Sequence, residues 1–204
     1  MPKIGRMVLK KPLPEKALKD CRVDVARSLV DFQKVIAIRA AVFMAEQACP
    51  FEEEFDGNDF AATHLIGFCG NEPVGCLRLR WFNGFCKLER VCVLLPHRGS
   101  NIIKLMLAEC FELAARKGYQ LMIGQIQERL IELWSHVFRF EIRTKRKSLA
   151  FSGYQYVEID IALPKHPKKI EAHADPYLVI RPEGSWDEPG VLEHTAVEIS
   201  TRAA

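Results

Sequence analysis

Hydrophobic and polar positions along the first half of the chain predict a strand, a long helix and a three-stranded meander. Residues 21–27 alternate as a half-buried strand does, and Ser28 can cap a helix over about 29–47, which ends at or before Pro50. Three apolar runs follow, separated by turn formers at 71–73 and 83–84. Their spacing predicts an antiparallel meander over roughly residues 64–95.

The second half of the chain alternates between helices and strands. The segment from Ile102 to Lys117 has one apolar face and is followed by Gly118, a residue type common just after helix ends. We expect a strand at 120–127, a helix at about 128–137, and two closing strands at 141–145 and 154–163. The predicted class is α/β, with a mixed central sheet flanked by helices.

Composition agrees with a folded globular protein. The 204 residues are 49% hydrophobic and 27% charged. Seven cysteines occur without a Cys-x-x-Cys motif or a His-rich cluster, which predicts reduced thiols, a cytoplasmic location and no metal site. No run of about 18 apolar residues occurs, so no membrane span is predicted.

Proline and charge distribution divide the chain into three predicted parts. Residues 1–21 form a basic leader, residues 22–163 the main domain, and residues 164–204 a C-terminal extension that packs on the core or on the second subunit of a homodimer. Residues 44–60 carry six acidic side chains and no basic one, whereas a basic run spans 139–147. The basic runs lack interleaved aromatic residues, which makes nucleic-acid binding an unfavoured function.

Residues 96–101, Pro-His-Arg-Gly-Ser-Asn, lead into the helix at Ile102. A helix start offers backbone N–H groups without intrahelical partners and the positive end of a dipole, so a tight loop there can bind a diphosphate. Arg98 adds a positive charge. Since Arg-Gly before a helix is also common in structural turns, the loop alone leaves both interpretations open.

The order of elements, with this loop between the fourth strand and its helix, resembles the GNAT acyl-CoA N-acyltransferase superfamily. A resemblance to its ElaA-like group is carried by residues 38–50, Ile-Arg-Ala-Ala-Val-Phe-Met-Ala-Glu-Gln-Ala-Cys-Pro, and by Glu53, Asp56, Gly57, Asp59 and His64-Leu65. The resemblance spans roughly residues 25–163. It implies a GNAT-type mixed central sheet of about seven strands flanked by helices.

The resemblance also implies a reaction. An acyl group, acetyl in the simplest case, would move from acetyl-CoA or a longer acyl-CoA to a small-molecule primary amine by direct attack. In the family, the fourth strand pairs with the pantetheine arm and the loop amides bind the pyrophosphate. These roles would fall on Val91, Cys92 and Val93, and on Arg98, Gly99, Ser100, Asn101 and Ile102. Acceptor-binding residues would be Arg39, Phe43, Glu46, Asp56, Asp59 and His64.

Other roles for two of these acceptor residues remain open. Arg39 could instead lock the acidic loop by pairing with Asp56 or Asp59, and His64 could be a structural histidine.

Glu89 is the candidate general base. Regular alternation along its strand would place Glu89, Val91 and Val93 on one side, near the thioester. A carboxylate there could accept the ammonium proton of the amine through water. The alternative is an ion pair between Glu89 and either Arg78 or Arg90.

The chain departs from the family pattern at three positions. Asn101 and Ile103 replace small residues of the phosphate loop, and Ser135 replaces the tyrosine that commonly protonates the leaving thiolate. Because a coenzyme A thiolate is a tolerable leaving group near neutral pH, the loss of catalysis would be partial. Ser135 is therefore the second candidate catalytic position, and a non-catalytic acyl-CoA sensor is an open alternative.

A second enzyme class shares part of the pattern. Acyl-homoserine-lactone synthases and N-acyl amino acid synthases have Arg-x-x-x-Phe with Asp-x-x-Asp, and Arg90 resembles the arginine of their Glu-x-x-Arg strand. Lys87 stands where that motif has glutamate. A donor acyl carrier protein could dock on a basic surface at Arg143, Lys145, Arg146 and Lys147.

Overall fold

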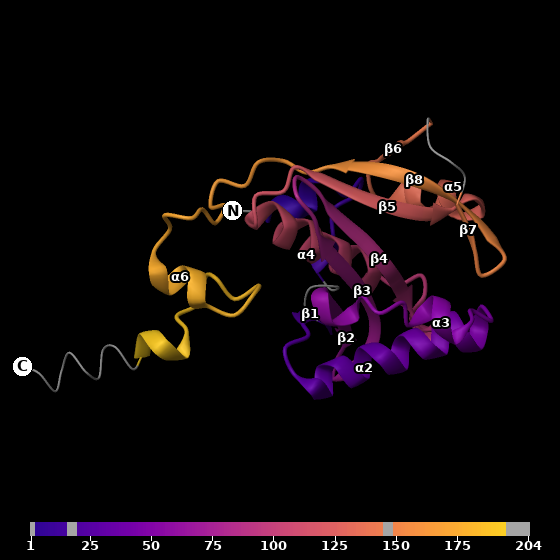
Figure 1. The fold of residues 1–204 in the computed structure, drawn as a ribbon, viewed down its shortest axis with the longest axis horizontal. Coiled ribbons are helices and arrows are strands. Elements are labelled where there is room, and N and C mark those ends of the chain that lie inside the picture. Colours follow the sequence, from indigo (N-terminus) through magenta and orange to yellow (C-terminus); the bar gives the residue numbers. More distant parts are fainter. Residues whose placement is uncertain (1–2, 16–19, 145–148, 195–204) are drawn as a thin grey trace, which may run out of the picture.

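The computed structural model describes residues 3–15, 20–144 and 149–194 and has a mixed α/β fold (Figure 1). The strand order of its central sheet is β1-β2-β3-β4-β5-β8-β6, with β7 paired to β8. β4 and β5 run parallel, and the other neighbouring strands run antiparallel. The strands are β1 (Cys21–Val25), β2 (Thr63–Cys69), β3 (Glu72–Trp81), β4 (Cys86–Val93), β5 (Leu121–Gln127), β6 (Glu141–Ile142), β7 (Leu149–Phe151) and β8 (Tyr154–Ala162).

The predicted α/β class and the meander β2-β3-β4 are confirmed, but the sheet has eight strands rather than about seven. The additional strand is β7, which forms a hairpin with β8. Ser152 and Gly153 connect them with φ values of 50° and 74°. Positive φ at both central residues is the geometry that two-residue hairpins favour. A three-residue run before this turn is too short to give a periodicity signal.

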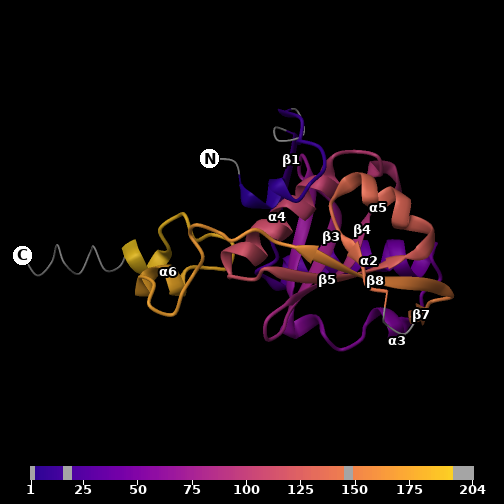
Figure 2. The same ribbon diagram turned by 90° about the horizontal axis from the view of Figure 1, so that it is seen from above.

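Helices cover both faces of the sheet (Figures 1 and 2). One face carries α2 (Leu29–Arg39), its π-helical continuation η2 (Ala40–Glu46) and α3 (Phe51–Glu54). The other face carries α4 (Ile102–Arg116) and α5 (Ile131–Val137). The remaining helical segments are η1 (Ile4–Met7), η3 (Asp59–Ala61), η4 (Leu95–His97), η5 (Glu128–Leu130) and α6 (Pro176–Ile180).

The helix predicted over 29–47 is one rod in which the hydrogen bonding changes at Ala40. Ser28 caps it as expected, since its hydroxyl accepts from the Asp31 N–H at 3.1 Å. A π-helical stretch of this kind is rare and occurs frequently at functional sites. Here it leads into the acidic segment that starts at α3.

The main core lies between the sheet and α4. Met106, Leu107 and Phe111 of α4 are fully buried there, together with aliphatic residues of β3, β4 and β8. η1 also approaches α4 closely, because a Cβ added to Gly5 would lie 1.9 Å from the Ala108 carbonyl oxygen. The described part of the basic leader thus packs on the domain, although the boundary at residue 21 stays a prediction.

The described part of the C-terminal extension lies beside α4 and β1, on the side of the molecule away from α5 and β7 (Figures 1 and 2). Glu183 accepts hydrogen bonds from the Arg27 and Thr63 side chains. Asp187 pairs with Arg116 at 3.0 Å. These contacts attach the extension to the main domain, and the predicted boundary at residue 164 and the homodimer stay predictions.

Within the described ranges, no helix has the length and apolar composition needed to span a membrane.

Candidate active site

β4 and β5 separate part-way along their length. Their parallel pairing covers three residue pairs, from Cys86–Met122 to Leu88–Gly124. Beyond this point β4 continues beside β3, and β5 continues beside β8. Among the described residues, no ladder joins the two strands past Leu88, so each presents backbone N–H and C=O groups to the gap between them.

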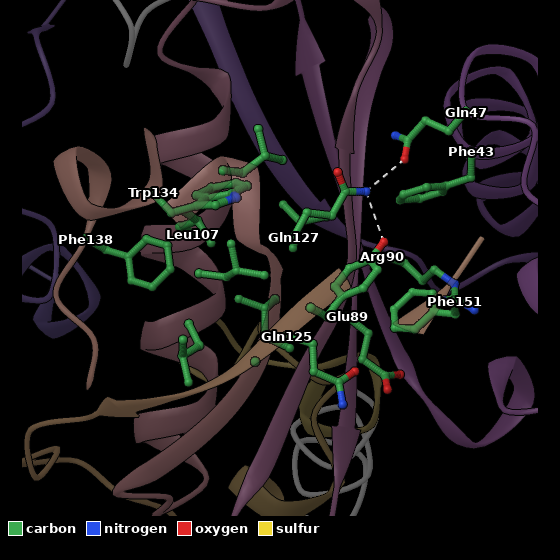
Figure 3. A pocket seen from close by; sticks show the side chains of 17 residues that line it. Phe43, Gln47, Glu89, Arg90, Leu107, Gln125, Gln127, Trp134, Phe138 and Phe151 are labelled. Carbon is green, nitrogen blue, oxygen red and sulfur yellow. Dashed lines mark hydrogen bonds between the residues drawn. The ribbon is translucent and has the colours of Figure 1, made fainter. Parts of the chain in front are cut away.

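A pocket of about 150 Å³ opens at this separation (Figure 3). Leu107, Trp134 and Phe138 line one side of it, next to α4 and α5. Phe43 and Phe151 line the other side, next to η2 and β7. The pocket therefore reaches from one face of the sheet toward the other, with apolar side chains on both sides.

Polar side chains gather between these two sides. They are Gln47, Glu89, Arg90, Gln125, Gln127 and Tyr156. The Gln127 amide donates to the Tyr156 hydroxyl at 3.0 Å and to the Gln47 side-chain oxygen at 3.2 Å. No motif in the sequence points to Gln127 and Tyr156, because their proximity arises from the pairing of β5 with β8, in which they are direct partners.

A bulge in β4 interrupts the expected alternation of side chains between the two faces of the sheet. Arg90 has φ of 53°, and the pairing register with β3 shifts at this point. An extra residue on one strand reverses the facing of the side chains beyond it. Val91 and Val93 consequently pack on the α4 side of the sheet, whereas Glu89 lies on the α2 side with Arg78. The prediction that Glu89, Val91 and Val93 share one side is wrong.

Glu89 nevertheless lines the pocket, with an ion pair to the Arg78 guanidinium at 2.7 Å and another to the Lys87 ammonium at 2.6 Å. Burial opposes ionisation of this carboxyl, but the Lys87 hydrogen bond and the Arg78 charge outweigh burial and lower its pKa. Glu89 is thus held as a carboxylate at neutral pH. Glu89 can form the ion pair and still act as a base, but its cationic neighbours make it a weaker base.

Beneath α2 and α3 lies a group of buried and partly buried charges that we call the ionic cluster. Its members are Arg39, Glu54, Asp56, Asp59, Arg78, Glu89 and Arg90. Arg39 and Arg78 are both 0% exposed and both bind Asp59, at 2.6 and 2.9 Å. Arg39 thus forms one of the two pairs that the alternative interpretation named, the one with Asp59, while the acceptor-binding role of either residue stays a prediction.

The same cluster determines the charge state of the acidic loop. Burial would raise the pKa of Asp56, but hydrogen bonds from Arg78 and from the Asn58 backbone outweigh it and lower that pKa. Burial raises the pKa of Glu54 despite its contact with Arg39. Burial lowers the pKa of His64, whose Nε2 lies 3.1 Å from the Asp59 carbonyl oxygen, so His64 is neutral at pH 7.

Of the six residues predicted to bind the acceptor, Phe43 is the one that lines the pocket. Arg39, Asp59 and His64 are buried elsewhere, in or beside the ionic cluster. The remaining two, Glu46 and Asp56, are partly exposed and pair with arginines.

The predicted phosphate loop lies between η4 and α4. Gly99 has φ of 81°, while Asn101, at φ of −81°, does not use the left-handed conformation that asparagine tolerates. The N–H groups of the first turn, from Ile102 onward, point out of the helix start. Arg98 donates to the Val93 carbonyl oxygen at 2.9 Å and pairs with Glu46 at 2.5 Å. Bulky Ile103 packs on the core instead of crowding the loop.

Ser135 lies on α5 outside the pocket lining. Its hydroxyl donates to the Glu132 carbonyl oxygen of the preceding turn at 2.7 Å. Cys92 is buried on the α2 side, with its sulfur 3.6 Å from that of Cys76. The β4–β5 separation is therefore flanked by three of the residues predicted for catalysis or coenzyme binding, namely Glu89, Val91 and the backbone of Cys92. Ser135 does not flank it.

Comparison with known proteins identifies the family. The model of the acetyltransferase (GNAT) family matches residues 32–136, which is half of the chain. The chain belongs to the GNAT family. The uncharacterized N-acetyltransferase YjcF of Bacillus subtilis is 30% identical to it over 116 residues, covering 56% of this chain and 83% of that protein. Family membership makes the chain an acyl-CoA-dependent N-acyltransferase, as the sequence resemblance implied.

Solved structures share the GNAT fold. An acyl-CoA N-acyltransferase from Pseudomonas aeruginosa superimposes with a TM-score of 0.62 at 19% identity, covering 70% of this chain and 99% of that one. Escherichia coli ElaA has a TM-score of 0.60 at 18% identity, covering 68% of this chain and 98% of that one. The ElaA structure agrees with the group that residues 38–50 resemble, and at this identity the likeness concerns the fold.

Proposed function

We propose that this GNAT protein transfers an acetyl group from acetyl-CoA to a primary amine by direct attack, with the thioester held where β4 and β5 separate. The observation that carries the proposal is the pocket through the sheet, whose edges are unpaired backbone of two strands. An extended pantetheine arm has amide groups that can pair with such an edge. Residues Val91, Cys92 and Val93 of β4 supply that edge.

The loop from Arg98 to Ile102 would bind the pyrophosphate of the coenzyme. It supplies N–H groups at the start of a 15-residue helix. Arg98, whose side chain is 40% exposed, supplies a guanidinium. Glu46 pairs with that guanidinium. A pyrophosphate carries more charge than one carboxylate and would compete with Glu46 for Arg98.

The amine would approach from the α2 side, where Phe43, Gln47 and Glu89 line the pocket. Glu89 would accept the ammonium proton through water, and a backbone N–H of β4 would polarise the thioester carbonyl. Holding both reactants in line lowers the barrier by several kcal/mol, which is about the contribution that well-oriented reactions show. Acidic residues around the acceptor side are balanced by the arginines of the ionic cluster, so local charge alone does not determine the amine.

The inner side of the pocket favours a second candidate donor. Leu88, Leu107, Ile126, Phe138 and Ile159 give it an apolar lining. Such a lining suits an acyl chain longer than acetyl, as in the N-acyl amino acid synthase alternative. Carrier-protein docking stays a prediction, since Arg143 pairs with Glu158 and Asp160 while Lys145, Arg146 and Lys147 lie outside the described residues. A cytoplasmic location also stays part of this proposal.

Turnover and binding test the proposal together. Release of free thiol from acetyl-CoA and from longer acyl-CoAs, measured over a panel of primary amines, identifies the donor, and no release from any donor contradicts the enzyme. Arg98→Glu is expected to weaken coenzyme A binding by an order of magnitude or more in calorimetry, because a charge-assisted contact of roughly 1.5–3 kcal/mol is replaced by repulsion. Glu46→Gln is the matched control, since it frees Arg98 and should leave binding equal or tighter.

A further inference from the structure

Tyr156 brings a phenol hydroxyl into the pocket. It lies on β8 directly opposite Gln127 of β5, and its ring stacks on Phe151 with centroids 3.8 Å apart and planes at 12°. Among the described residues that line the pocket, Tyr156 supplies the one hydroxyl group. The hairpin that carries it is attached to the acidic segment, because the Ser152 hydroxyl donates to Glu53 at 2.6 Å.

The hydrogen bonds around Gln127 determine what the Tyr156 hydroxyl can do. The Gln127 side-chain oxygen accepts from the Arg129 guanidinium at 2.9 Å, which fixes the amide orientation. The Gln127 NH₂ group therefore points at Tyr156 and donates to its oxygen at 3.0 Å. An NH₂ group cannot accept a hydrogen bond. The hydroxyl hydrogen of Tyr156 is consequently left to donate to another group in the pocket.

Ser135 is placed in the opposite way. Its hydroxyl hydrogen is used by the Glu132 carbonyl oxygen of its own helix, and the residue does not line the pocket. In related enzymes a tyrosine at that helical position commonly protonates the leaving thiolate. Here the helix offers no phenol, and a strand on the other side of β5 offers one.

We propose that Tyr156 is the proton donor to the sulfur of the departing coenzyme A, an inference that rests on the proposed acyl transfer. The amine nitrogen forms a bond to the thioester carbonyl carbon, and the carbon–sulfur bond breaks with its electron pair going to sulfur. The Tyr156 O–H proton moves to that sulfur and gives the free thiol. Glu89 takes the first proton of the ammonium before attack, and the second proton that the nitrogen loses returns through water to the phenolate. Tyr156 is thus restored, and the one proton held by Glu89 passes to solvent.

The protonation state of Tyr156 agrees with this role. Burial raises the pKa of the phenol, although the Gln127 hydrogen bond opposes the increase. The group thus carries its proton throughout the neutral range. A donor must hold its proton until the sulfur acquires negative charge.

Two acyl donors that differ in the acidity of the leaving thiol test the proposal. Thiol release is measured for wild type, Tyr156→Phe and Tyr154→Phe, with acetyl-CoA and with S-acetyl-4-nitrothiophenol, each at saturating amine. Phe keeps the ring and its stacking on Phe151 but has no proton to give. Tyr154 lies two residues away on the same strand, against Arg129 and outside the pocket lining, and is the matched control.

With acetyl-CoA, Tyr156→Phe is expected to lower kcat by about 10²-fold or more, the loss that removal of a general acid produces. With the nitrothiophenol ester, the same variant should turn over nearly as wild type does, because that thiolate leaves without protonation. Tyr154→Phe should match wild type with both donors. Circular dichroism and coenzyme A affinity of Tyr156→Phe should match wild type.

Three results would overturn the proposal. Equal losses with both donors would make Tyr156 a positioning residue only, and unchanged turnover with acetyl-CoA would remove it from the reaction. A large loss in Ser135→Ala combined with normal Tyr156→Phe would return the role to the helix. Absence of thiol release from wild type with every donor contradicts the proposed function itself, which distinguishes that failure from a failure of Tyr156.

Discussion

Where α4 covers the sheet, the buried side chains are aliphatic and aromatic, whereas the face under α2 and α3 holds two fully buried arginines among four carboxylates. The two faces meet within single strands. On β3, Leu77 and Leu79 pack toward α4, while Arg78 between them points into the ionic cluster. The pocket opens from one face to the other at the place where β4 and β5 separate.

The difference teaches how each face specifies structure. The α4 face is stabilised by apolar area removed from water, at about 25 cal/mol per Å², which depends little on the orientation of neighbours. The ionic cluster depends on geometry, because a buried charge is costly unless its partners are in place. We expect the α4 face to provide most of the stability and the ionic cluster to fix the acidic loop beside the pocket.

The largest expected effect concerns the part of the ionic cluster that faces the pocket. Glu89→Gln keeps size and hydrogen bonding but cannot accept a proton, so kcat should fall by about 10²–10⁴ with coenzyme A affinity nearly retained. Steady-state kinetics with acetyl-CoA measures the loss, and urea unfolding checks that the variant is folded. Normal turnover at saturating amine would assign the base role to water or to another residue.

Lys87→Met separates the two roles of Glu89. Its ammonium contributes to lowering the pKa of Glu89, so its removal should move the acidic limb of the kcat/KM profile to higher pH if Glu89 is the base. An unmoved limb would leave Glu89 with a structural role, as a partner of Arg78.

The next effect is on stability. Arg78→Ala leaves Asp56, Asp59 and Glu89 without their shared guanidinium, and removal of one partner from a buried ion pair costs about 3–5 kcal/mol. Urea unfolding midpoints at pH 7 measure the change. Asp24→Asn is the exposed control, since its pair with Arg22 should contribute no more than about 1 kcal/mol. Equal losses in the two variants would contradict the contrast between buried and exposed charge.

On the α4 face, Leu107→Ala should cost about 2–5 kcal/mol through lost burial and a residual cavity. Because Leu107 also lines the pocket, the variant should accept longer acyl donors better relative to acetyl-CoA than wild type does. Leu113→Ala, on the same helix but outside that pocket, is the control for stability without a change in donor preference. An unchanged donor preference in Leu107→Ala would show that the apolar lining does not bind the acyl chain.

The smallest effect is the pH dependence of stability. Asp56, Asp59 and Glu89 have lowered pKa values, so the stability they add is complete above the unfolded pKa near 4 and is lost as pH falls through their folded pKa values. Glu54, with a raised pKa, has the opposite sign and offsets part of the loss.

Each carboxyl changes the free energy of unfolding by at most about 1.4 kcal/mol per pH unit. Urea midpoints from pH 7 to pH 3 should decline for wild type and decline less for Arg78→Ala. Parallel curves for the two proteins would show that the ionic cluster does not control the acid limb.

The fold could be predicted from the sequence because the signals for its elements are local. The turn formers around Pro73 and Gly84 and the apolar period of α4 depend on neighbouring residues alone. The bulge at Arg90 could not be predicted, since an arginine with positive φ leaves no mark in the sequence. That conformation is held by contacts with Glu54 and with the Glu53 carbonyl, more than 30 residues away.

The candidate site was predicted unevenly for the same reason. The loop at Arg98 is a short contiguous motif and could be recognised, while Gln127 and Tyr156 meet only through strand pairing. Only the correspondence with a family motif that this chain does not keep points to Ser135. Its position outside the pocket lining depends on how α5 rotates against the core, which the seven residues of α5 do not specify.

The separation of β4 and β5 has a consequence for solubility. An unpaired strand edge normally invites other chains to add to it, and natural sheets shorten, twist or cover their outer edges to prevent aggregation. Here two open edges face each other inside the sheet, with α5 on one side and the β7–β8 hairpin on the other. A folded neighbouring protein is too wide to enter the gap between the strands. The chain can therefore expose a row of hydrogen-bonding backbone groups to a slender ligand without exposing them to other proteins.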